Sequence, residues 1–433
     1  MISAELRQDQ VPAIFSRFCK VIGERIWLEH ATKVAAECQR YPYLQDYLQE
    51  QNRLVLALCR CSSAAARNGG RLPWGLTATP ELLEAFVFAF QTMQLVDAAR
   101  SISNKRANIL IARIKEAIRT PRMLQAMQLE ARVATHFVVA GRSVRFPELG
   151  SGREKFDLLV EDLGKNGLEI ECKVVTHDKG RKIHRLESRH FLAGFLAAPL
   201  TQVLARDLLG GLAIRVTVPD RMPPQDRYDD LVAAVHRQIL STASGELADG
   251  TRVTVTPFDP AILGELTKPL SETARDMIGR IVGSENRDLI VYQAEGGKGG
   301  LLVVVVDSAQ RDSMLHELFV TLTDSAARQM TGNRAAAFIS TFEGLHSEQL
   351  LEIASHEGRG GEHSALAWAA SAFLERPDFP YVVGVGFFGA PRFMQVGSAA
   401  NGVTYWIPKR TSPKWAPAFS GLFAGDPRTT QLR

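Results

Sequence analysis

The spacing of apolar residues changes near residue 140, and this change limits the folds open to the chain more than any other feature. Over residues 1–120, and again over 123–140, apolar residues recur every three or four positions. Polar and apolar residues then alternate over 143–146, 155–162 and 168–175. A period near 3.6 predicts helix and a period of two predicts strand. The sequence therefore predicts an all-helical module over residues 1–120, followed by a mixed α/β region.

The predicted α/β region divides at a proline-rich stretch. A helix over 188–209 and a strand over 211–218 follow the three alternating segments, and prolines then crowd the chain between 219 and 224. We expect one unit over 121–225 with the element order αβββαβ. Apolar strands and helices alternate again beyond it, which predicts a separate C-terminal α/β domain over 226–433 with a mainly parallel sheet.

Composition excludes several classes of protein. Hydrophobic residues make up 45% of the 433 residues, which is enough for packed domains and excludes intrinsic disorder. The 51 basic against 47 acidic residues leave a net charge of +4, too small by itself to indicate nucleic-acid binding. No signal-peptide pattern or long uncharged apolar run occurs, and the five cysteines are few. We therefore expect a cytoplasmic protein without a membrane partner.

Charged residues gather on one predicted strand, LEIECKVV at 168–175. Alternation places Glu169, Glu171 and Lys173 on one face of this strand. Asp157 lies on the preceding strand, across a predicted tight turn at 165–167. A hairpin can bring Asp157 close to Glu171, where two carboxylates are tolerated mainly if a cation lies between them.

A third carboxylate, Glu130, lies on the apolar side of the helix that precedes these strands. Its neighbours three and four positions away are Ala126, Met127, Val133 and Ala134. A buried carboxylate without a partner is costly. A divalent metal held with Asp157 and Glu171 would supply a partner for Glu130.

Glu130, Asp157 and the Glu-Cys-Lys run at 171–173, set on this order of elements, resemble the PD-(D/E)XK nuclease superfamily with its restriction-endonuclease-like fold. The resemblance covers about 100 of the 433 residues. It implies that Asp157 and Glu171 bind Mg²⁺, for which Mn²⁺ can substitute, and that Cys172 adds its backbone carbonyl. It further implies that Lys173 assists the attacking water and that Glu130 completes the metal shell.

One position departs from the family pattern, because Phe156 stands where the name-giving proline would be. The acidic and basic positions are all present. Carboxylate-bound Mg²⁺ beside an ammonium can activate water and neutralise a pentavalent phosphate. The alternative interpretation is a set of solvated charges on an exposed strand.

A basic segment follows the predicted site directly, over residues 177–190. Its position suits contacts with phosphates. The candidate nucleic-acid-binding residues are Lys179, Arg181, Lys182, Arg185 and Arg189. A solvated loop is the competing interpretation, and a second basic run over 100–122 is a weaker candidate for the same role.

The resulting expectation is a Mg²⁺-dependent nuclease that hydrolyses phosphodiester bonds, with DNA favoured over RNA. The competing hypothesis is a non-catalytic nucleic-acid-binding or assembly protein on the same fold. The sequence allows a homo-oligomer and leaves open endonuclease or exonuclease action, substrate preference, the role of the C-terminal domain and the biological role.

Overall fold

A computed structural model of the chain divides into two compact units. Unit 1 comprises Met1–Glu37, Leu48–Lys179 and Leu315–Arg433, and unit 2 comprises Cys38–Tyr47 and Gly180–Met314. The structure describes residues 6, 8–73, 75–76, 79, 82–147, 154–241, 244–263, 272–283, 288–293, 300–358, 362–390, 404–409, 419 and 421–423.

The N-terminal part of the chain is helical, as its apolar spacing predicts. The described helices before the first strand are α1 (Val11–Ile22), α2 (Arg25–Arg40), α3 (Gln45–Gln51), α4 (Arg53–Arg67), α5 (Leu83–Ile102), α6 (Asn104–Ile118) and α7 (Pro121–Val139), with short 3₁₀ turns at Gln8–Gln10 and Pro42–Leu44. Ser103 caps α6 by accepting from the backbone N–H of Arg106. Pro121 occupies the first turn of α7, where its missing N–H has no helical partner to lose.

The described strands of unit 1 form one mixed sheet in the order β1-β2-β3-β9-β10-β11. The strands are β1 (Val144–Arg145), β2 (Leu158–Val160), β3 (Leu168–Val175), β9 (Ala335–His346), β10 (Val382–Ala390) and β11 (Thr404–Pro408). The first three are antiparallel neighbours, β3, β9 and β10 run parallel, and β11 is antiparallel to β10.

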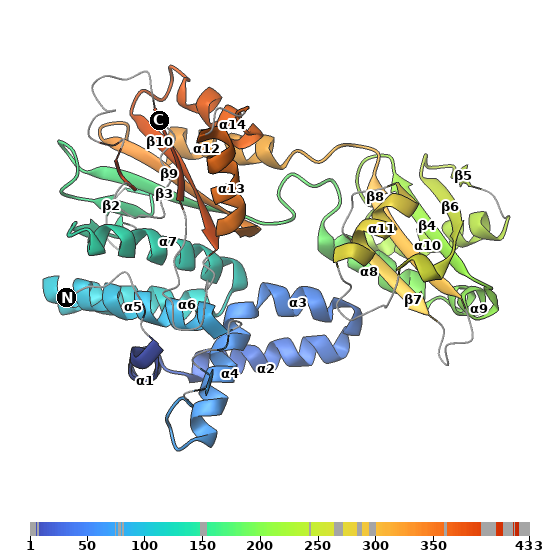
Figure 1. The fold of residues 1–433 in the computed structure, drawn as a ribbon, viewed down its shortest axis with the longest axis horizontal. Helices are drawn as coiled ribbons and strands as arrows, with labels where there is room; N and C mark the ends of the chain where they lie inside the picture. Colours follow the sequence, from blue (N-terminus) through green and yellow to red (C-terminus); the bar gives the residue numbers. More distant parts are fainter. Residues whose placement is uncertain are drawn as a thin grey trace. The chain divides into compact units, whose positions relative to one another are not determined.

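Helices cover both faces of this sheet (Figure 1). Helix α7 packs on one face, where its apolar side chains join Leu158, Ile170 and Ala337 in one core cluster. Helices α12 (Met314–Arg328), α13 (Ser347–Gly358) and α14 (Ala365–Leu374) contribute to a second cluster, on the other face. Burial on both faces explains why β9 begins as an uninterrupted apolar run.

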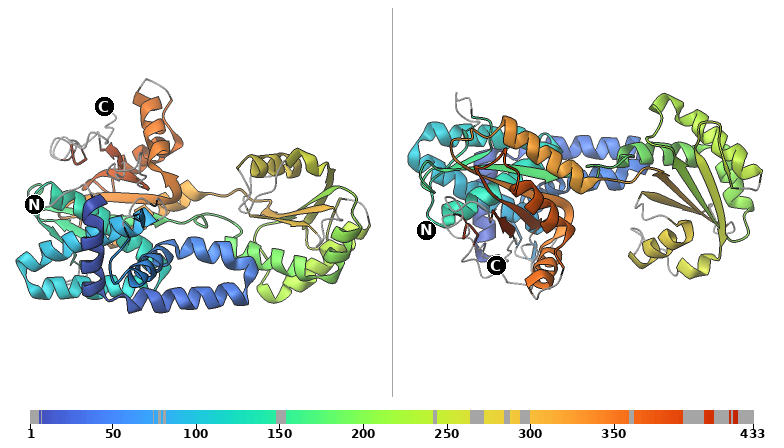
Figure 2. Two further views of the ribbon diagram at one scale, coloured as in Figure 1. Left: turned by 60° about the horizontal axis from the view of Figure 1, so that its bottom comes forward. Right: turned by 90° about the horizontal axis from the view of Figure 1, so that it is seen from above.

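Unit 2 contains a second mixed sheet, with the order β5-β6-β4-β8-β7 among the described strands. Its strands are β4 (Gly211–Val218), β5 (Gly245–Glu246), β6 (Arg252–Phe258), β7 (Leu289–Gln293) and β8 (Leu301–Ser308), and its helices are α8 (Arg185–Ala197), α9 (Pro199–Asp207), α10 (Tyr228–Leu240) and α11 (Glu272–Val282), with 3₁₀ turns at Gln225–Arg227 and Pro260–Leu263. Helices α8 and α10 pack on one face and α11 on the other (Figure 2).

The structure divides the chain differently from the expected domains at 121–225 and 226–433. The strand at 211–218 lies in the sheet of unit 2, whereas β3 takes β9, more than 150 residues later in the chain, as its parallel neighbour. Gly180–Met314 is thus inserted between β3 and α12. The two connecting segments meet, because the Ser313 N–H donates to the Gly180 carbonyl at 2.9 Å. Apolar patterning identified these strands but could not specify their partners.

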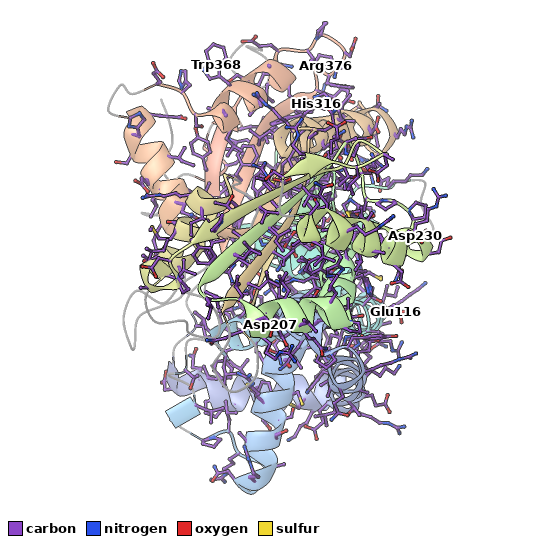
Figure 3. All side chains as sticks on the ribbon, turned by 90° about the vertical axis from the view of Figure 1, so that its right-hand side faces the viewer. Glu116, Asp207, Asp230, His316, Trp368 and Arg376 are labelled. Carbon is purple, nitrogen blue, oxygen red and sulfur yellow. The ribbon has the colours of Figure 1, made fainter. Side chains whose placement is uncertain are left out.

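The surface of both units carries charged side chains. Glu116 on α6 and Asp207 and Asp230 of unit 2 are exposed examples (Figure 3). Among the described helices, none is long and apolar enough to cross a membrane.

Candidate functional site

The alternation predicted for β3 is present in the structure. Ile170 and Cys172 face α7 and belong to its core cluster, so Glu171 and Lys173 project from the opposite face. On the parallel neighbour β9, Glu171 is paired with Phe338 and Lys173 with Ser340. Glu171 is 2% exposed, so this carboxylate is not a solvated surface charge. The interpretation of β3 as an exposed strand is therefore wrong.

Lys173 neutralises the buried Glu171. Its Nζ donates to Glu171 Oε1 and lies 3.4 Å from Oε1 of Gln329, which follows α12. The lysine side chain keeps 23% of its surface exposed. The ammonium thus links a buried carboxylate to solvent.

Asp157 is fixed to the same strand by a hydrogen bond. It immediately precedes β2, and its Oδ2 accepts from the backbone N–H of Cys172 at 2.7 Å. Leu158, the first residue of β2, is paired with Ile170, and Asp157 precedes this pairing. The structure thus brings Asp157 to the backbone next to Glu171, and the close approach of the two carboxylates stays a prediction.

Glu130 is paired with an arginine that sequence reasoning did not connect to it. Its carboxylate, on α7, is 3% exposed, and its two oxygens lie 3.0 and 2.8 Å from Arg113 Nη2 on α6. The same nitrogen is 4.0 Å from Asp157 Oδ1. Arg113 therefore supplies the partner that a buried Glu130 requires. The sequence predicts that a buried Glu130 needs a partner of opposite charge. It does not predict that Arg113 is this partner, because the two residues lie on different helices.

The charged side chains around Cys172 shift the pKa of its thiol. Burial raises the pKa of Cys172 well above its usual value, and the carboxylates of Asp157, Glu130 and Glu171 raise this pKa further, against the opposing effect of Lys173. The thiol is protonated and unsuited to act as a nucleophile. Negative charge thus prevails around the centre of β3.

The carboxylates of Glu130, Asp157 and Glu171 are not arranged as a complete metal-binding site. Across the described ranges of the chain, no group of three or more His, Cys, Asp or Glu side chains is arranged to hold an ion. Alternation along β3 sends Glu171 to the face away from α7, whereas Glu130 on α7 and Asp157 both lie within 4.0 Å of Arg113 on α6. Asp157, Glu171 and the Cys172 carbonyl remain as oxygen donors, the ligand type that Mg²⁺ prefers.

Glu169, the other acid on this face of β3, has a structural role. It is fully buried, and it accepts from the Thr331 backbone N–H at 2.9 Å, from the Thr331 hydroxyl and from Arg334 Nη1 at 3.2 Å. These bonds fix the turn that leads into β9.

The five basic candidates do not belong to one unit. Lys179 ends a segment of unit 1, and its Nζ donates to Thr321 Oγ1 at 2.7 Å. Arg181 and Arg185 belong to unit 2 and lie 2.7 and 3.6 Å from the carboxylate of Asp288, which is 2% exposed. Both arginines therefore balance a buried charge within unit 2.

The two remaining basic candidates also lie in unit 2. The backbone N–H of Lys182 donates to Asp312 at 3.1 Å, and its Nζ is 3.7 Å from Asp220. Burial lowers the pKa of Arg189, with Asp288 acting against this effect and Arg185 adding to it. The five basic candidates are close together in the sequence, but they contact different side chains in the structure.

A polar group at the end of the parallel strands was not found from the sequence. Glu343 on β9 accepts from Gln125 Nε2 at 2.8 Å and from the backbone N–H of His177 at 2.9 Å. Open α/β sheets bind ligands at the carboxyl ends of their strands. No local motif marks Glu343, because its neighbours come from α7 and from the residues after β3.

No family model, curated protein or solved structure matches the chain.

Proposed function

We propose that the protein is a Mg²⁺-dependent nuclease that hydrolyses phosphodiester bonds, with DNA favoured over RNA as the substrate. The observation that carries the proposal is the hydrogen bond that holds Asp157 to the Cys172 N–H, beside Glu171, with Lys173 bonded to Glu171. Two carboxylates and an ammonium are the groups that metal-assisted phosphodiester hydrolysis requires.

The order of elements in unit 1 supports the same proposal. Helix α7 leads into antiparallel β1, β2 and β3, and α12 then leads into β9, parallel to β3. This order resembles the αβββαβ core of the PD-(D/E)XK superfamily. The last helix and strand of this proposed core are α12 and β9, within residues 314–346, rather than the elements over 188–218.

In this mechanism Asp157, Glu171 and the Cys172 carbonyl would hold the metal. Bound Mg²⁺ would supply Lewis acidity and a more acidic water. Lys173, which is both bonded to Glu171 and partly exposed, would orient the attacking water and offset phosphate charge. Mn²⁺ has the same preference for oxygen donors and would substitute.

Glu130 has a positioning role in this proposal rather than a place in the metal shell. It holds Arg113, whose guanidinium lies 4.0 Å from Asp157. A nearby cation favours the ionised form of a carboxylate. The Glu130–Arg113 pair would thus orient Asp157 and offset its negative charge.

Contacts with the nucleic-acid backbone are proposed first for Lys179 and Lys182. Arg181 and Arg185 already balance Asp288. Among the described residues, a hydroxyl holds the Lys179 ammonium, and an exposed carboxylate lies 3.7 Å from that of Lys182. Phosphate contacts of this kind give affinity without sequence preference.

A second candidate function is nucleic-acid binding without cleavage. The three carboxylates of the candidate site each have a partner within the protein, which favours this function. Glu130 pairs with Arg113, Glu171 pairs with Lys173, and Asp157 accepts from the Cys172 N–H. A purely structural network needs no metal.

A cleavage assay separates the two functions. Supercoiled, linear and single-stranded DNA and RNA are incubated with the full chain, with and without Mg²⁺. We expect Mg²⁺-dependent cleavage of at least one DNA form, lost in Asp157→Asn and kept in the control Asp230→Asn, which removes an exposed charge on α10. Salt-sensitive binding without cleavage, unchanged in Asp157→Asn, would support the second function and overturn the first.

A further inference from the structure

A cavity of about 750 Å³ lies in unit 1, outside the carboxylate site. It is lined by the end of α5, the start of α6, the end of α7 and the residues that lead into β1. Cavities of roughly 300–1,000 Å³ are typical of small-molecule sites. Its size therefore suits an organic ligand rather than a single ion.

The walls of the cavity are mainly aliphatic. Leu95, Ile109, Leu110, Val138 and Val144 line it, and Phe146 is the aromatic residue among its described lining. The neutral polar lining consists of serine hydroxyls, at positions 101, 103 and 143. A nucleobase would leave its hydrogen-bonding edge against these apolar walls and would find one ring for stacking. An aliphatic body fits the lining better.

Positive charge surrounds this apolar interior. Lys105, Arg106, Arg142 and Arg145 line the cavity, and no acidic side chain is among its described lining residues. Arg145 lies 2.8 Å from Glu154 and Arg142 lies 3.9 Å from an Asp162 oxygen, so acids outside the cavity hold these two.

Lys105 and Arg106 are the cations available to a ligand. Both are exposed, and neither forms an ion pair with any side chain that the structure describes. They occupy the first turn of α6, whose capped N-terminus faces the cavity at Ser103. The positive end of the helix dipole adds to their charge.

We propose that this cavity binds an aliphatic carboxylate of fatty-acid type. The alkyl chain occupies the space among Leu95, Leu110 and Val138, and the carboxylate lies between Lys105 and Arg106 at the start of α6. Burial of each CH₂ group favours a long chain, and the charge-assisted hydrogen bonds favour an anionic head. This site is independent of the proposed nuclease activity.

The test is a calorimetric titration of the full chain with dodecanoate, held below its critical micelle concentration. We expect saturable binding, and binding weaker by about tenfold or more for dodecan-1-ol, which has the same chain without the charge. Dodecyltrimethylammonium and adenosine monophosphate should bind more weakly still. Absence of dodecanoate binding, or tighter binding of adenosine monophosphate, would overturn the proposal.

Two variants locate the binding. Lys105→Gln/Arg106→Gln alters exposed side chains, so the fold should persist, and dodecanoate affinity should fall about tenfold while that of dodecan-1-ol stays unchanged. Ala98→Trp, which fills the cavity from α5, should abolish both. The matched control Lys33→Gln/Arg60→Gln removes two exposed charges elsewhere on unit 1 and should bind normally. Equal dodecanoate affinity in all variants would show that the ligand binds elsewhere and would contradict the assignment.

Discussion

Removing the partner of Glu130 should destabilise unit 1 strongly. Glu130 is 3% exposed and has both oxygens within 3.0 Å of Arg113 Nη2, so Arg113→Met leaves a buried negative charge that a nonpolar side chain cannot balance. Loss of one member of a buried ion pair costs about 3–5 kcal/mol. Asp157, 4.0 Å from the same nitrogen, loses a favourable charge as well. The free energy of unfolding of unit 1 should fall by about that amount.

The double variant Arg113→Met/Glu130→Met isolates the pair. Replacing a buried ion pair by apolar residues of similar volume is often neutral or stabilising. We therefore expect most of the stability to return, giving a coupling energy of about 2–4 kcal/mol in a double-mutant cycle. The control Arg60→Met, at an exposed position on α4, should change stability by less than about 0.5 kcal/mol.

Tryptophan fluorescence during urea unfolding measures these values for unit 1 alone. All five tryptophans of the chain, at 27, 74, 368, 406 and 415, fall within the segments of unit 1. Trp27 and Trp406 are fully buried, so their emission should shift on unfolding. A coupling energy below about 0.5 kcal/mol, within the additivity expected for independent sites, would refute the assignment of Arg113 as the partner of Glu130.

Two further perturbations test the fold. Burial raises the pKa of Glu84, but Arg53 and Arg132 lower it below the ordinary 4.5, so stability from Glu84 is complete above about pH 4.5 and is lost as the pH falls through the folded-state pKa. Urea unfolding at pH 3–5 should show a shallower loss of stability in Glu84→Gln, and an unchanged slope would contradict this. Gly180 has φ +73°, and an added Cβ would lie 2.7 Å from the Ser313 carbonyl carbon, so Gly180→Ala should destabilise unit 2 by about 2 kcal/mol, measured by circular dichroism. Normal stability of this variant would refute the close approach of the two connecting segments.

Local elements could be predicted from the sequence where one periodicity dominated. The strand at 168–175 was predicted with its observed limits, because acidic and apolar residues alternate over its first positions. The predicted helix at 188–209 is two helices, α8 and α9, because Pro199 cannot continue the first.

The assembly of these elements could not be predicted in the same way. Strands β4 and β9 are both strongly apolar and each runs parallel to a neighbour, so nothing in their composition indicates which of them pairs with β3. The choice depends on contacts across the insertion of Gly180–Met314. The expected mainly parallel C-terminal domain was therefore divided between two mixed sheets.

The candidate site was predictable where its residues share one hairpin. The approach of Asp157 to the strand that carries Glu171 could be predicted from the hairpin, and a partner for Glu130 could be required from burial alone. Arg113 and Glu343 escaped prediction because their partners lie on other elements. The basic segment was expected to bind phosphates as one group. Two of its arginines, Arg181 and Arg185, instead balance the buried carboxylate of Asp288.

The most direct test of the proposed activity is the rate of plasmid nicking as a function of Mg²⁺ concentration, measured for the wild-type chain and for Asp157→Asn. We expect a rate that saturates with Mg²⁺ and falls by about a hundredfold or more in Asp157→Asn, with the variant still folded by tryptophan fluorescence. A rate that is independent of Mg²⁺, or equal in the two proteins, would contradict the proposed activity.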